Sequence, residues 1–488
     1  MNNITKDIFL NTSVCPTLGW LLRSGEEIEQ LSVEALTLAE QFRIEQGLDI
    51  HNRARQLFPD GILVERKNLD KAIKETEELM NKLSVSTTLE ATFLVDDYAT
   101  KADILKRKGD GWHLFETKSG VNEKPEHIDD MAYTAMVFQK AGYKISAVSL
   151  LLISKDYRLG MKDEDLFIEI DYTDKILARS TEFQALLFDY VKSVTSAPTK
   201  PVPDLRRECK ACPLFRDCVG KDIINHVLEI PRLTQTKFDQ LKGLNIHCIE
   251  DIPDEFPLTD NQSRVRNCVI SQQPSVNDQL KSDLSSIIWP AYYLDFETVM
   301  TAIPLYPDIA PYTQLPTQYS IHKLSDIKTI IDHREYLADS CRDCRKEFAV
   351  HLINDLEDKG SIIVYSSFEK TTMTKLGQIY PELADQLNTL IERLVDLEAI
   401  IRKNYYHPEF HGSTSIKVTL PALVSELSYS DLEIAEGDSA SAAFAYLAQG
   451  KYSEENEVED IRNKLLRYCE RDTLAMVKLH EKLMGCIG

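Results

Sequence analysis

Two carboxylates and a lysine lie at the ends of neighbouring predicted strands. Asp103 lies in one short strand, and Glu116 and Lys118 end the next, after a glycine-containing turn. If these strands pair as a hairpin, the three side chains can converge, because Glu116 and Lys118 project to the same face at a two-residue period. Carboxylate oxygens hold a hard divalent cation, and a lysine beside them stabilises or deprotonates the nucleophile in phosphodiester hydrolysis. An ordinary surface hairpin with charged tips is the alternative.

A histidine and four cysteines add further metal-ligand types to this part of the chain. His51 lies near the end of a predicted helix, where a structural role is the alternative. Cys209, Cys212 and Cys218 follow the spacing C-x2-C-x5-C. Three thiolates leave a tetrahedral site one ligand short, and Cys15 can supply the fourth. Unrelated buried thiols are the alternative, above all for Cys15.

In this order, these residues resemble the RecB-like exonucleases of the PD-(D/E)xK superfamily that carry a [4Fe–4S] cluster, over roughly residues 5–220. These include the CRISPR-associated iron–sulfur exonucleases and the AddB-type repair nucleases. The resemblance implies that His51, Asp103, Glu116 and the carbonyl of Thr117 bind Mn²⁺ or Mg²⁺, and that Lys118 is the catalytic lysine. It also implies that a cluster ties the two ends of this domain together through four ligands, Cys15, Cys209, Cys212 and Cys218.

The sequence departs from this family on the helix that follows the strands. The family usually carries a glutamine followed four residues later by a tyrosine. Here Thr134 and Phe138 occupy the best-aligned positions, with Tyr133 adjacent. The positioning of DNA is the property that this departure puts in doubt.

A second group of carboxylates lies in the last third of the chain. Asp295 and Glu297 lie on one face of an otherwise apolar strand, where buried charge is costly unless it is paired or holds a metal. Tyr468 and Asp472 lie one turn apart on a long predicted helix. A two-metal site needs about four carboxylates, and a tyrosine can orient the attacking water.

These C-terminal residues resemble the DnaQ-like exonucleases of the RNase H-like fold, in the subclass with tyrosine in the last motif, over roughly residues 290–486. By this resemblance Asp295 and Glu297 form the first motif, and Tyr468 and Asp472 the last. For the remaining acidic ligand we favour Glu369 over its rival Asp396, on position. The block from Thr298 to Tyr319 also resembles an uncharacterised bacterial domain.

Hydrophobic periodicity predicts the elements that position these residues. The expected fold is α/β, with a PD-(D/E)xK nuclease core at residues 1–220, a helical connector at 221–285 and an RNase H-like mixed sheet with flanking helices at 286–488. In the connector, Leu233–Phe256 suggests two short helices, loosely like a helix-hairpin-helix. Cys341 and Cys344 are expected to lie on a helix as incidental thiols. The other expected helices are Glu27–Ala54, Lys124–Lys140 and Glu454–Met484.

The expected strands fall into two groups along the chain. In the N-terminal group they are Thr92–Tyr98, Ala102–Lys106, Trp112–Thr117 and Ala147–Ile153. In the C-terminal group they are Tyr292–Glu297, Gln318–Lys323, Thr329–Tyr336 and Ser361–Tyr365.

Composition narrows the class of protein. The chain has 488 residues, enough for several domains, and a formal net charge of -22, which argues against a protein that simply coats nucleic acid. It does not argue against an enzyme that gathers carboxylates around cations. With no signal-peptide core at Met1–Ser13 and no apolar run near the roughly 20 residues of a membrane span, we expect a cytoplasmic protein without a membrane partner.

Together these features predict a metal-dependent nuclease, an exonuclease by resemblance, that hydrolyses DNA ends or single strands in repair or in defence against foreign DNA. Its expected cofactors are Mg²⁺ or Mn²⁺ and a [4Fe–4S] cluster, and its expected partner is nucleic acid. A nucleic-acid-binding scaffold with degenerate nuclease domains is one alternative. A nuclease stabilised by zinc, without iron, is another.

Overall fold

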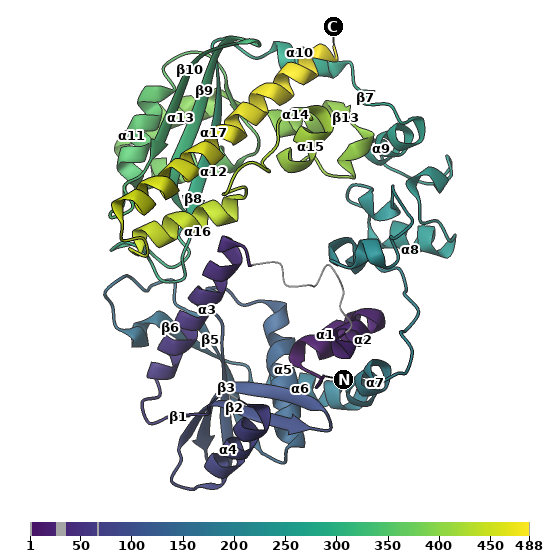
Figure 1. The fold of residues 1–488 in the computed structure, drawn as a ribbon, viewed down its shortest axis with the longest axis vertical. Coiled ribbons are helices and arrows are strands. Elements are labelled where there is room, and N and C mark those ends of the chain that lie inside the picture. The colour runs from purple at the N-terminus through teal and green to yellow at the C-terminus, as the bar shows by residue number, and fades with distance from the viewer. Residues whose placement is uncertain (1, 26–35, 66–67, 488) are drawn as a thin grey trace. The chain divides into compact units, whose positions relative to one another are not determined.

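The computed structural model describes residues 2–25, 36–65 and 68–487 (Figure 1). The chain forms two compact units. Unit 1 comprises residues 1–36, 40–204 and 301–313, and unit 2 comprises residues 37–39, 205–300 and 314–488. Both units combine one mixed sheet with flanking helices, so the predicted α/β class is confirmed.

Unit 1 is built on a six-stranded sheet in the order β1-β2-β3-β4-β5-β6. β2, β3 and β4 are antiparallel neighbours, and β4 pairs in parallel with β5 through the crossover helix α5. Its strands are β1 Ile62–Leu63, β2 Thr87–Val95, β3 Tyr98–Lys108, β4 Gly111–Thr117, β5 Ile145–Ile153 and β6 Phe167–Asp171. Its main helices are α1 Lys6–Val14, α2 Pro16–Ser24, α3 Leu38–Gln56, α4 Leu69–Asn81, α5 Pro125–Lys140, α6 Thr173–Glu182 and α7 Phe188–Thr195.

Successive side chains along each strand point to opposite faces of the sheet, so unit 1 has one hydrophobic core on each face. Leu114 of β4 packs with the helices α5 and α1, whereas Phe115 packs with Ala54 of α3 on the other side. The predicted hairpin is present, with Ile104 of β3 opposite Phe115 of β4. The sheet therefore brings the end of β4 beside β3, where the predicted carboxylates lie.

The predicted strand Thr92–Tyr98 is wrong in its bounds. β2 ends at Val95, and Tyr98 already belongs to β3. Between them Asp96 and Asp97 have φ angles of 48° and 77°, the left-handed conformation that a tight hairpin turn requires and that aspartate tolerates. Of the predicted helix Glu27–Ala54, residues 27–35 lie outside the described residues, and the described helix α3 begins at Leu38.

Unit 2 contains a five-stranded sheet in the order β10-β9-β8-β11-β12. β8 is antiparallel to β9 and parallel to β11. The strands of this sheet are β8 Ala291–Val299, β9 Leu315–Asp326, β10 Thr329–Leu337, β11 Ile362–Val364 and β12 Leu394–Asp396. Two short strands, β7 Ser275–Val276 and β13 Tyr405–Tyr406, pair with each other in a separate antiparallel sheet. The main helices of unit 2 are α8 Gln235–Gly243, α9 Asp260–Ser271, α10 Gln279–Ser285, α11 Arg345–Asp355, α12 Phe368–Ile379, α13 Ala384–Glu392, α14 Leu397–Asn404, α15 Ile416–Leu423, α16 Gly437–Ala448 and α17 Glu455–Gly485.

The central strand β8 packs apolar side chains on both of its faces. Leu294 and Phe296 pack with α11, α12 and α13, whereas Tyr293 packs in the core that includes α17. The long helix α17 runs across the sheet on that second side (Figure 1). By the two-residue period of a strand, Asp295 and Glu297 share the face of Tyr293 and point toward α17.

Two helix predictions in unit 2 are wrong in detail. The second helix expected in Leu233–Phe256 is only a 3-10 turn at Ile249–Asp251. Cys341 is not helical, because the backbone N–H of Cys341 bonds to Asp339 in a local turn, and α11 begins only after Cys344.

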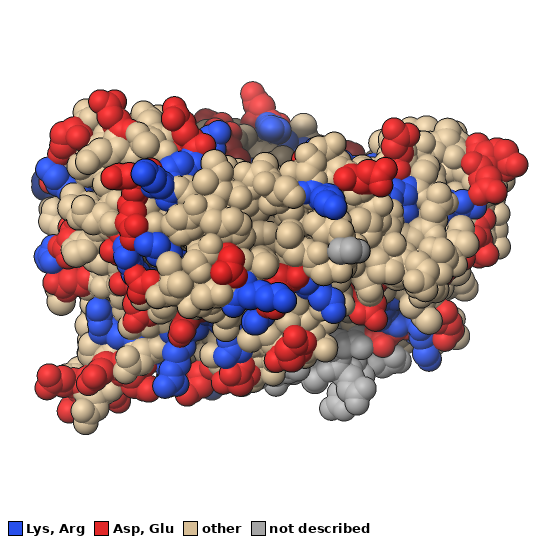
Figure 2. Space-filling model, turned by 90° about the horizontal axis from the view of Figure 1, so that it is seen from above, with Lys and Arg blue, Asp and Glu red and all other residues tan. Residues whose placement is uncertain are grey.

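Charged side chains are mixed on the surface. Asp and Glu side chains are interspersed with Lys and Arg over the face drawn in Figure 2. Among the helices that the structure describes, none combines the length and the apolar character that a membrane crossing needs.

Candidate metal and catalytic sites

The N-terminal residues predicted from the sequence line one cavity of about 680 Å³ in unit 1. They are His51, Asp103, Glu116, Thr117 and Lys118. The cavity also takes in Lys6, from the first turn of α1. The ends of β3 and β4, the helix α3 and the N-terminus of the chain therefore contribute to one site.

Lys118 is held between two carboxylates. Its Nζ atom lies 3.0 Å from Glu116 Oε1 and 2.5 Å from Asp130 Oδ2 of helix α5. Burial would lower the pKa of Lys118, but the charges of Glu116 and Asp130 raise it above its ordinary value. Lys118 is therefore a cation at neutral pH, suited to stabilise negative charge rather than to accept a proton.

The two strand carboxylates differ in their charge state. Burial, together with the charge of Glu116, raises the pKa of Asp103 to about 8, although the backbone N–H of Thr117 donates to Asp103 Oδ2 at 2.8 Å. Burial would also raise the pKa of Glu116, but Lys6 and Lys118 beside it lower the value to about 2. A cation at this site would bind a permanently charged Glu116 and would displace a proton from Asp103.

His51 lies beside these acids. Its Nδ1 atom is 3.7 Å from Asp103 Oδ2, and burial lowers the pKa of its ring, which favours the neutral form that ligates metals. Ligand atoms of His51, Asp103 and Glu90 all lie within 4.8 Å of one another. This histidine is thus placed to act with the carboxylates.

Glu90, Lys6 and Asp130 were missed by the sequence reasoning. Glu90 of β2 is 1% exposed, is ion-paired with Arg55 and Lys101, and has a φ angle of 60° that is unusual for a side chain of its size. A buried acid within a strand is a detectable signal, but the strand predicted here began only after Glu90. Nothing local marks Lys6, which contacts Glu116 from 110 positions away.

The helix positions that depart from the RecB-like pattern face inward. Thr134 is buried, with its Oγ1 atom 3.2 Å from Thr100 Oγ1. The neighbouring Tyr133 is fully buried, and its hydroxyl donates to the carbonyl of Ile4 at 2.6 Å. Both side chains support the packing of α5 and not a surface for DNA.

The cysteines predicted as cluster ligands are all half-buried. Cys209 lies in the short 3-10 helix Arg207–Ala211 and Cys212 follows that helix directly, whereas Cys218 follows a second one, Phe215–Asp217. These three lie in unit 2, and Cys15 lies in unit 1 at the junction of α1 and α2. None of the three metal-suited groups found among the described residues contains a cysteine, so the cluster stays a prediction.

The C-terminal carboxylates do converge. Asp295 and Glu297 of β8 and Asp472 of α17 each offer an oxygen, all within 4.8 Å of one another. Burial, and then the charge of Asp472, raises the pKa of Glu297 to about 8 and that of Asp295 well above its usual range. Burial raises the pKa of Asp472 to about 6. Three acids that oppose each other's ionisation in this way form a site that a cation would relieve.

Glu369 and Asp396 are the rival candidates for the remaining ligand, and their carboxylates differ in hydrogen bonding. Glu369, in the first turn of α12, is 2% exposed, and its Oε2 atom has no hydrogen-bond partner among the described residues. Its charge also raises the pKa values of Asp295 and Glu297. Asp396 instead caps α14, because its Oδ1 atom accepts from the N–H of Ala399 at 2.9 Å. The geometry favours Glu369.

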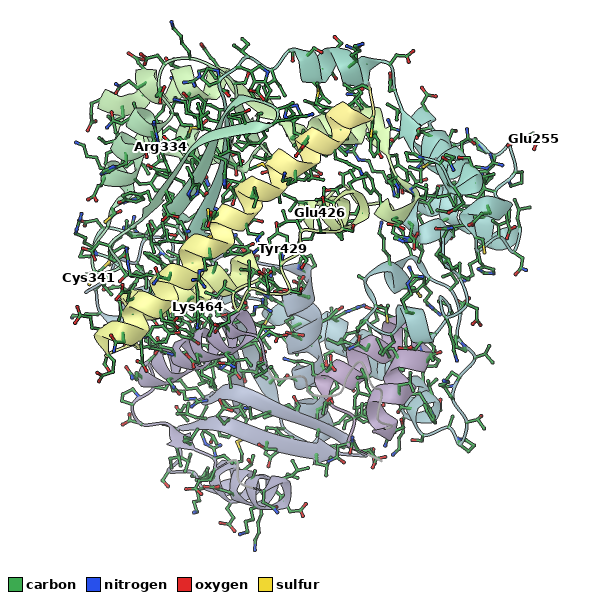
Figure 3. All side chains as sticks on the ribbon, turned by 45° about the horizontal axis from the view of Figure 1, so that its top comes forward. Glu255, Arg334, Cys341, Glu426, Tyr429 and Lys464 are labelled. Carbon is green, nitrogen blue, oxygen red and sulfur yellow. The ribbon has the colours of Figure 1, made fainter. Side chains whose placement is uncertain are left out.

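Tyr468 lies beside the acids, with a neighbour that the sequence reasoning missed. Burial, and then the charge of Asp472, raises the pKa of the Tyr468 hydroxyl, so it stays protonated. Tyr429, which lies against α17 in Figure 3, donates a hydrogen bond to Asp472 Oδ1. Gly437 at the start of α16 passes close by, since a Cβ atom there would lie 3.6 Å from Glu297 Oε2.

The comparisons with known proteins match parts of the chain. Residues 292–415 match DUF2779, a domain of unknown function, and the matched range includes Thr298–Tyr319. The chain is 23% identical over 229 residues to the uncharacterized protein MG366 of Mycoplasma genitalium, covering 42% of this chain and 33% of that protein. It is 25% identical over 232 residues to the MG366 homolog of Mycoplasma pneumoniae, covering 42% of this chain and 34% of that protein. The chain thus spans about a third of the length of these relatives, to which it is distantly similar.

Proposed function

We propose that this protein is a metal-dependent nuclease that hydrolyses phosphodiester bonds of nucleic acid, with DNA ends or single strands as substrate, in repair or in defence against foreign DNA. The observation that carries the proposal is the cavity of unit 1, where Asp103, Glu116 and His51 meet a cationic lysine, Lys118. Two carboxylates and an imidazole can hold a divalent cation, and a lysine beside them can stabilise the charge that grows on a phosphodiester during hydrolysis.

The donor set at this cavity fits a divalent cation. Carboxylate oxygens suit Mg²⁺ and Mn²⁺, and the neutral ring of His51 adds a nitrogen donor that favours Mn²⁺. Asp103 and Glu116 would hold the cation together with His51 and the carbonyl of Thr117. When bound, it would polarise the phosphate and make a water more acidic.

The chain's own residues have separate tasks in this proposal. The N–H of Thr117 holds the carboxylate of Asp103 in place. Glu116 and Asp130 keep Lys118 charged and point its ammonium group into the cavity. That ammonium would stabilise the negative charge that grows on the phosphate in the transition state, where a fixed positive charge has its largest effect.

A second hydrolytic site in unit 2 is supported by the convergence of Asp295, Glu297 and Asp472. With Glu369, these acids would hold two divalent cations, in an RNase H-like, DnaQ-like arrangement. The protonated hydroxyl of Tyr468 would orient the attacking water. The partnerless oxygen of Glu369 supports this proposal, because a buried carboxylate oxygen without a donor is costly unless a cation meets it.

We also propose that Cys209, Cys212 and Cys218 ligate a [4Fe–4S] cluster. The support is the C-x2-C-x5-C spacing and the partial exposure of these three thiols, which leaves them reachable by iron. A zinc ion held by the same thiols is the alternative.

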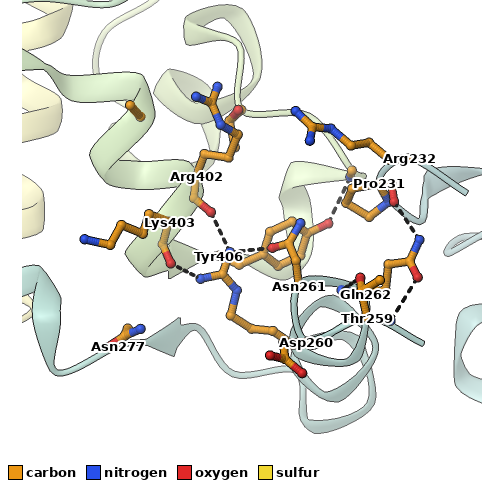
Figure 4. A pocket seen from close by; sticks show the side chains of 14 residues that line it. Pro231, Arg232, Thr259, Asp260, Asn261, Gln262, Asn277, Arg402, Lys403 and Tyr406 are labelled. Carbon is orange, nitrogen blue, oxygen red and sulfur yellow. Dashed lines mark hydrogen bonds between the residues drawn. The ribbon is translucent and has the colours of Figure 1, made fainter. Parts of the chain in front are cut away.

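A basic cavity of about 730 Å³ in unit 2 offers a surface for phosphate groups. Arg232, Arg402 and Lys403 lie around it (Figure 4). Arg264 supports its wall, because the guanidinium donates to the carbonyls of Arg402 and Lys403 at the end of α14. Clustered Lys and Arg side chains of this kind can bind the phosphate backbone of a nucleic acid locally, although the whole chain has a net charge of -22.

Cleavage of end-labelled single- and double-stranded DNA and RNA with Mg²⁺ or Mn²⁺ tests the proposal. Glu116→Gln and Asp295→Asn, alone and combined, assign any activity to one site or the other. The proposal expects metal-dependent hydrolysis that the combined variant lacks. A parent chain that binds DNA without cutting it would favour the scaffold alternative.

A further inference from the structure

A third group of metal-suited side chains lies in unit 2 and has no part in the proposed hydrolysis. His322, His333 and Glu470 each offer one ligand atom, all within 4.8 Å of one another. His322 on β9 and His333 on β10 are direct cross-strand partners, with ring centroids 4.5 Å apart. Glu470 comes from α17. Two strands and one helix therefore contribute to a single cluster.

Hydrogen bonds orient the ring of His322. The hydroxyl of Thr473 donates to the carbonyl of Glu470 at 3.0 Å, so its oxygen is free to accept the proton of His322 Nδ1 at 2.8 Å. This arrangement leaves the lone pair on His322 Nε2. A hydrogen bond to the second ring nitrogen is the usual support of a metal-binding histidine.

The same network reaches His333. Ser320 Oγ lies 2.9 Å from Thr473 Oγ1 and 3.0 Å from His333 Nε2. When the Ser320 hydroxyl donates to Thr473, its oxygen accepts from His333 Nε2–H, and the lone pair of His333 lies on Nδ1. One chain of hydrogen bonds thus fixes the tautomer of both rings and leaves one nitrogen of each ring with a lone pair for a metal ion.

His322 is also in the charge state that a metal needs. It is 5% exposed, and burial, followed by the charge of His333, lowers its pKa to about 4. The ring is therefore neutral at pH 7, and no proton has to leave before it can act as a ligand.

We propose that His322, His333 and Glu470 bind a Zn²⁺ ion. Two imidazoles and one carboxylate are a ligand set typical of zinc, and the set is poorer for Mg²⁺, which prefers oxygen alone. The ion would link β9 and β10 to α17, the helix that carries Tyr468 and Asp472. Glu470 and Thr473 lie about one turn apart on a side of α17 that faces these strands, so the ion does not share the ligands Asp295, Glu297 and Asp472.

Zinc content measured on the full chain tests this site. The protein is stripped with a chelator, reloaded with Zn²⁺ in excess Mg²⁺, passed through gel filtration and analysed for metal. The excess Mg²⁺ competes for the carboxylate sites, and the cysteines contribute the same zinc to every variant. His333→Ala and Glu470→Gln should each lose one equivalent of zinc. His351→Ala, which removes an exposed histidine of α11 outside the cluster, should lose none.

Thr473→Val tests the hydrogen-bond network separately. Valine keeps the buried shape but removes the oxygen that holds His322 Nδ1. Zinc affinity, measured by competition with a chromophoric chelator, should fall about 10–100-fold. Parental affinity in this variant would overturn the positioning role of Thr473. Equal zinc content in the parent, His333→Ala and Glu470→Gln would overturn the site itself, and so would an equal loss in His351→Ala.

Discussion

Glu297 is the carboxylate whose removal tests the C-terminal metal site most directly. It lies half-buried with Asp295 and Asp472 in a cluster whose carboxylate oxygens are within 4.8 Å of one another. Glu297→Gln keeps the shape of the side chain and removes one negative charge. In metal-free protein this change should stabilise the fold, whereas most buried polar substitutions destabilise it.

The structure sets both the sign and the size of that effect. The pKa of Glu297 rises from 4.5 in the unfolded chain to about 8 in the fold, so the folded state holds the proton more tightly. The contribution of protonated Glu297 to the free energy of unfolding is therefore fully present below about pH 4.5 and is lost as the pH rises through about 8. At about 1.4 kcal/mol for each pH unit, the cost of holding Glu297 charged, from burial first and then from the neighbouring acids, reaches about 4–5 kcal/mol above pH 8, an upper bound because those acids share it.

Thermal melting of the full chain without metal provides the assay. At about pH 8.5, Glu297→Gln should raise the melting temperature by about 5 °C, and at about pH 5.5, where Glu297 is already neutral, by little. Added Mn²⁺ at about 100 times its Kd should stabilise the parent by about 2.7 kcal/mol and the variant far less. Glu457→Gln, an exposed acid of α17, is the matched control. A variant that melts below the parent at high pH and keeps the full Mn²⁺ shift would refute the reasoning.

Three further outcomes follow from the same geometry. Glu369→Gln should reduce the Mn²⁺-induced rise in melting temperature more than Asp396→Asn does, because Asp396 is occupied as a helix cap; the reverse order would make Asp396 the ligand. Tyr468→Phe should leave that rise intact but slow cleavage by the C-terminal site, and an unchanged rate would remove Tyr468 from the mechanism. Cys212→Ser should lose iron and visible absorbance in protein purified without oxygen, whereas stoichiometric zinc without iron in the parent would contradict the cluster.

Some of the architecture could be predicted because it depends on local patterns. The apolar runs predicted β5 and β8, and the glycine-containing turn predicted the pairing of β3 with β4. Asp295 and Glu297 were found because two acids in a buried strand conflict with its apolar character. Such features can be recognised from residues that are close together in the sequence, or from a motif on one strand and a motif on one helix.

Other parts of the sites depend on contacts that no local pattern carries. Lys6 meets Glu116 from the first helix, and Tyr429 meets Asp472 from a loop 43 positions away. Predicting that His322 and His333 are neighbours would have required the register of β9 against β10, because a slip of one residue would place them on opposite faces of the sheet. Such pairings are set by tertiary packing, which the sequence alone did not resolve.

DNA cleavage by the Lys118→Ala variant tests most directly the central claim, that the cavity of unit 1 is a nuclease site in which Lys118 stabilises the transition state. The assay uses the full chain in an Asp295→Asn background, so that the C-terminal site does not contribute, with end-labelled single-stranded DNA and Mn²⁺. Loss of the ammonium should leave Glu116 paired with Lys6, which lies 3.2 Å away, and the fold intact. The cleavage rate should fall about 10²–10³-fold, while Lys124→Ala, an exposed lysine at the start of α5, should cut like its parent. A Lys118→Ala chain that cuts at the parental rate would contradict the account.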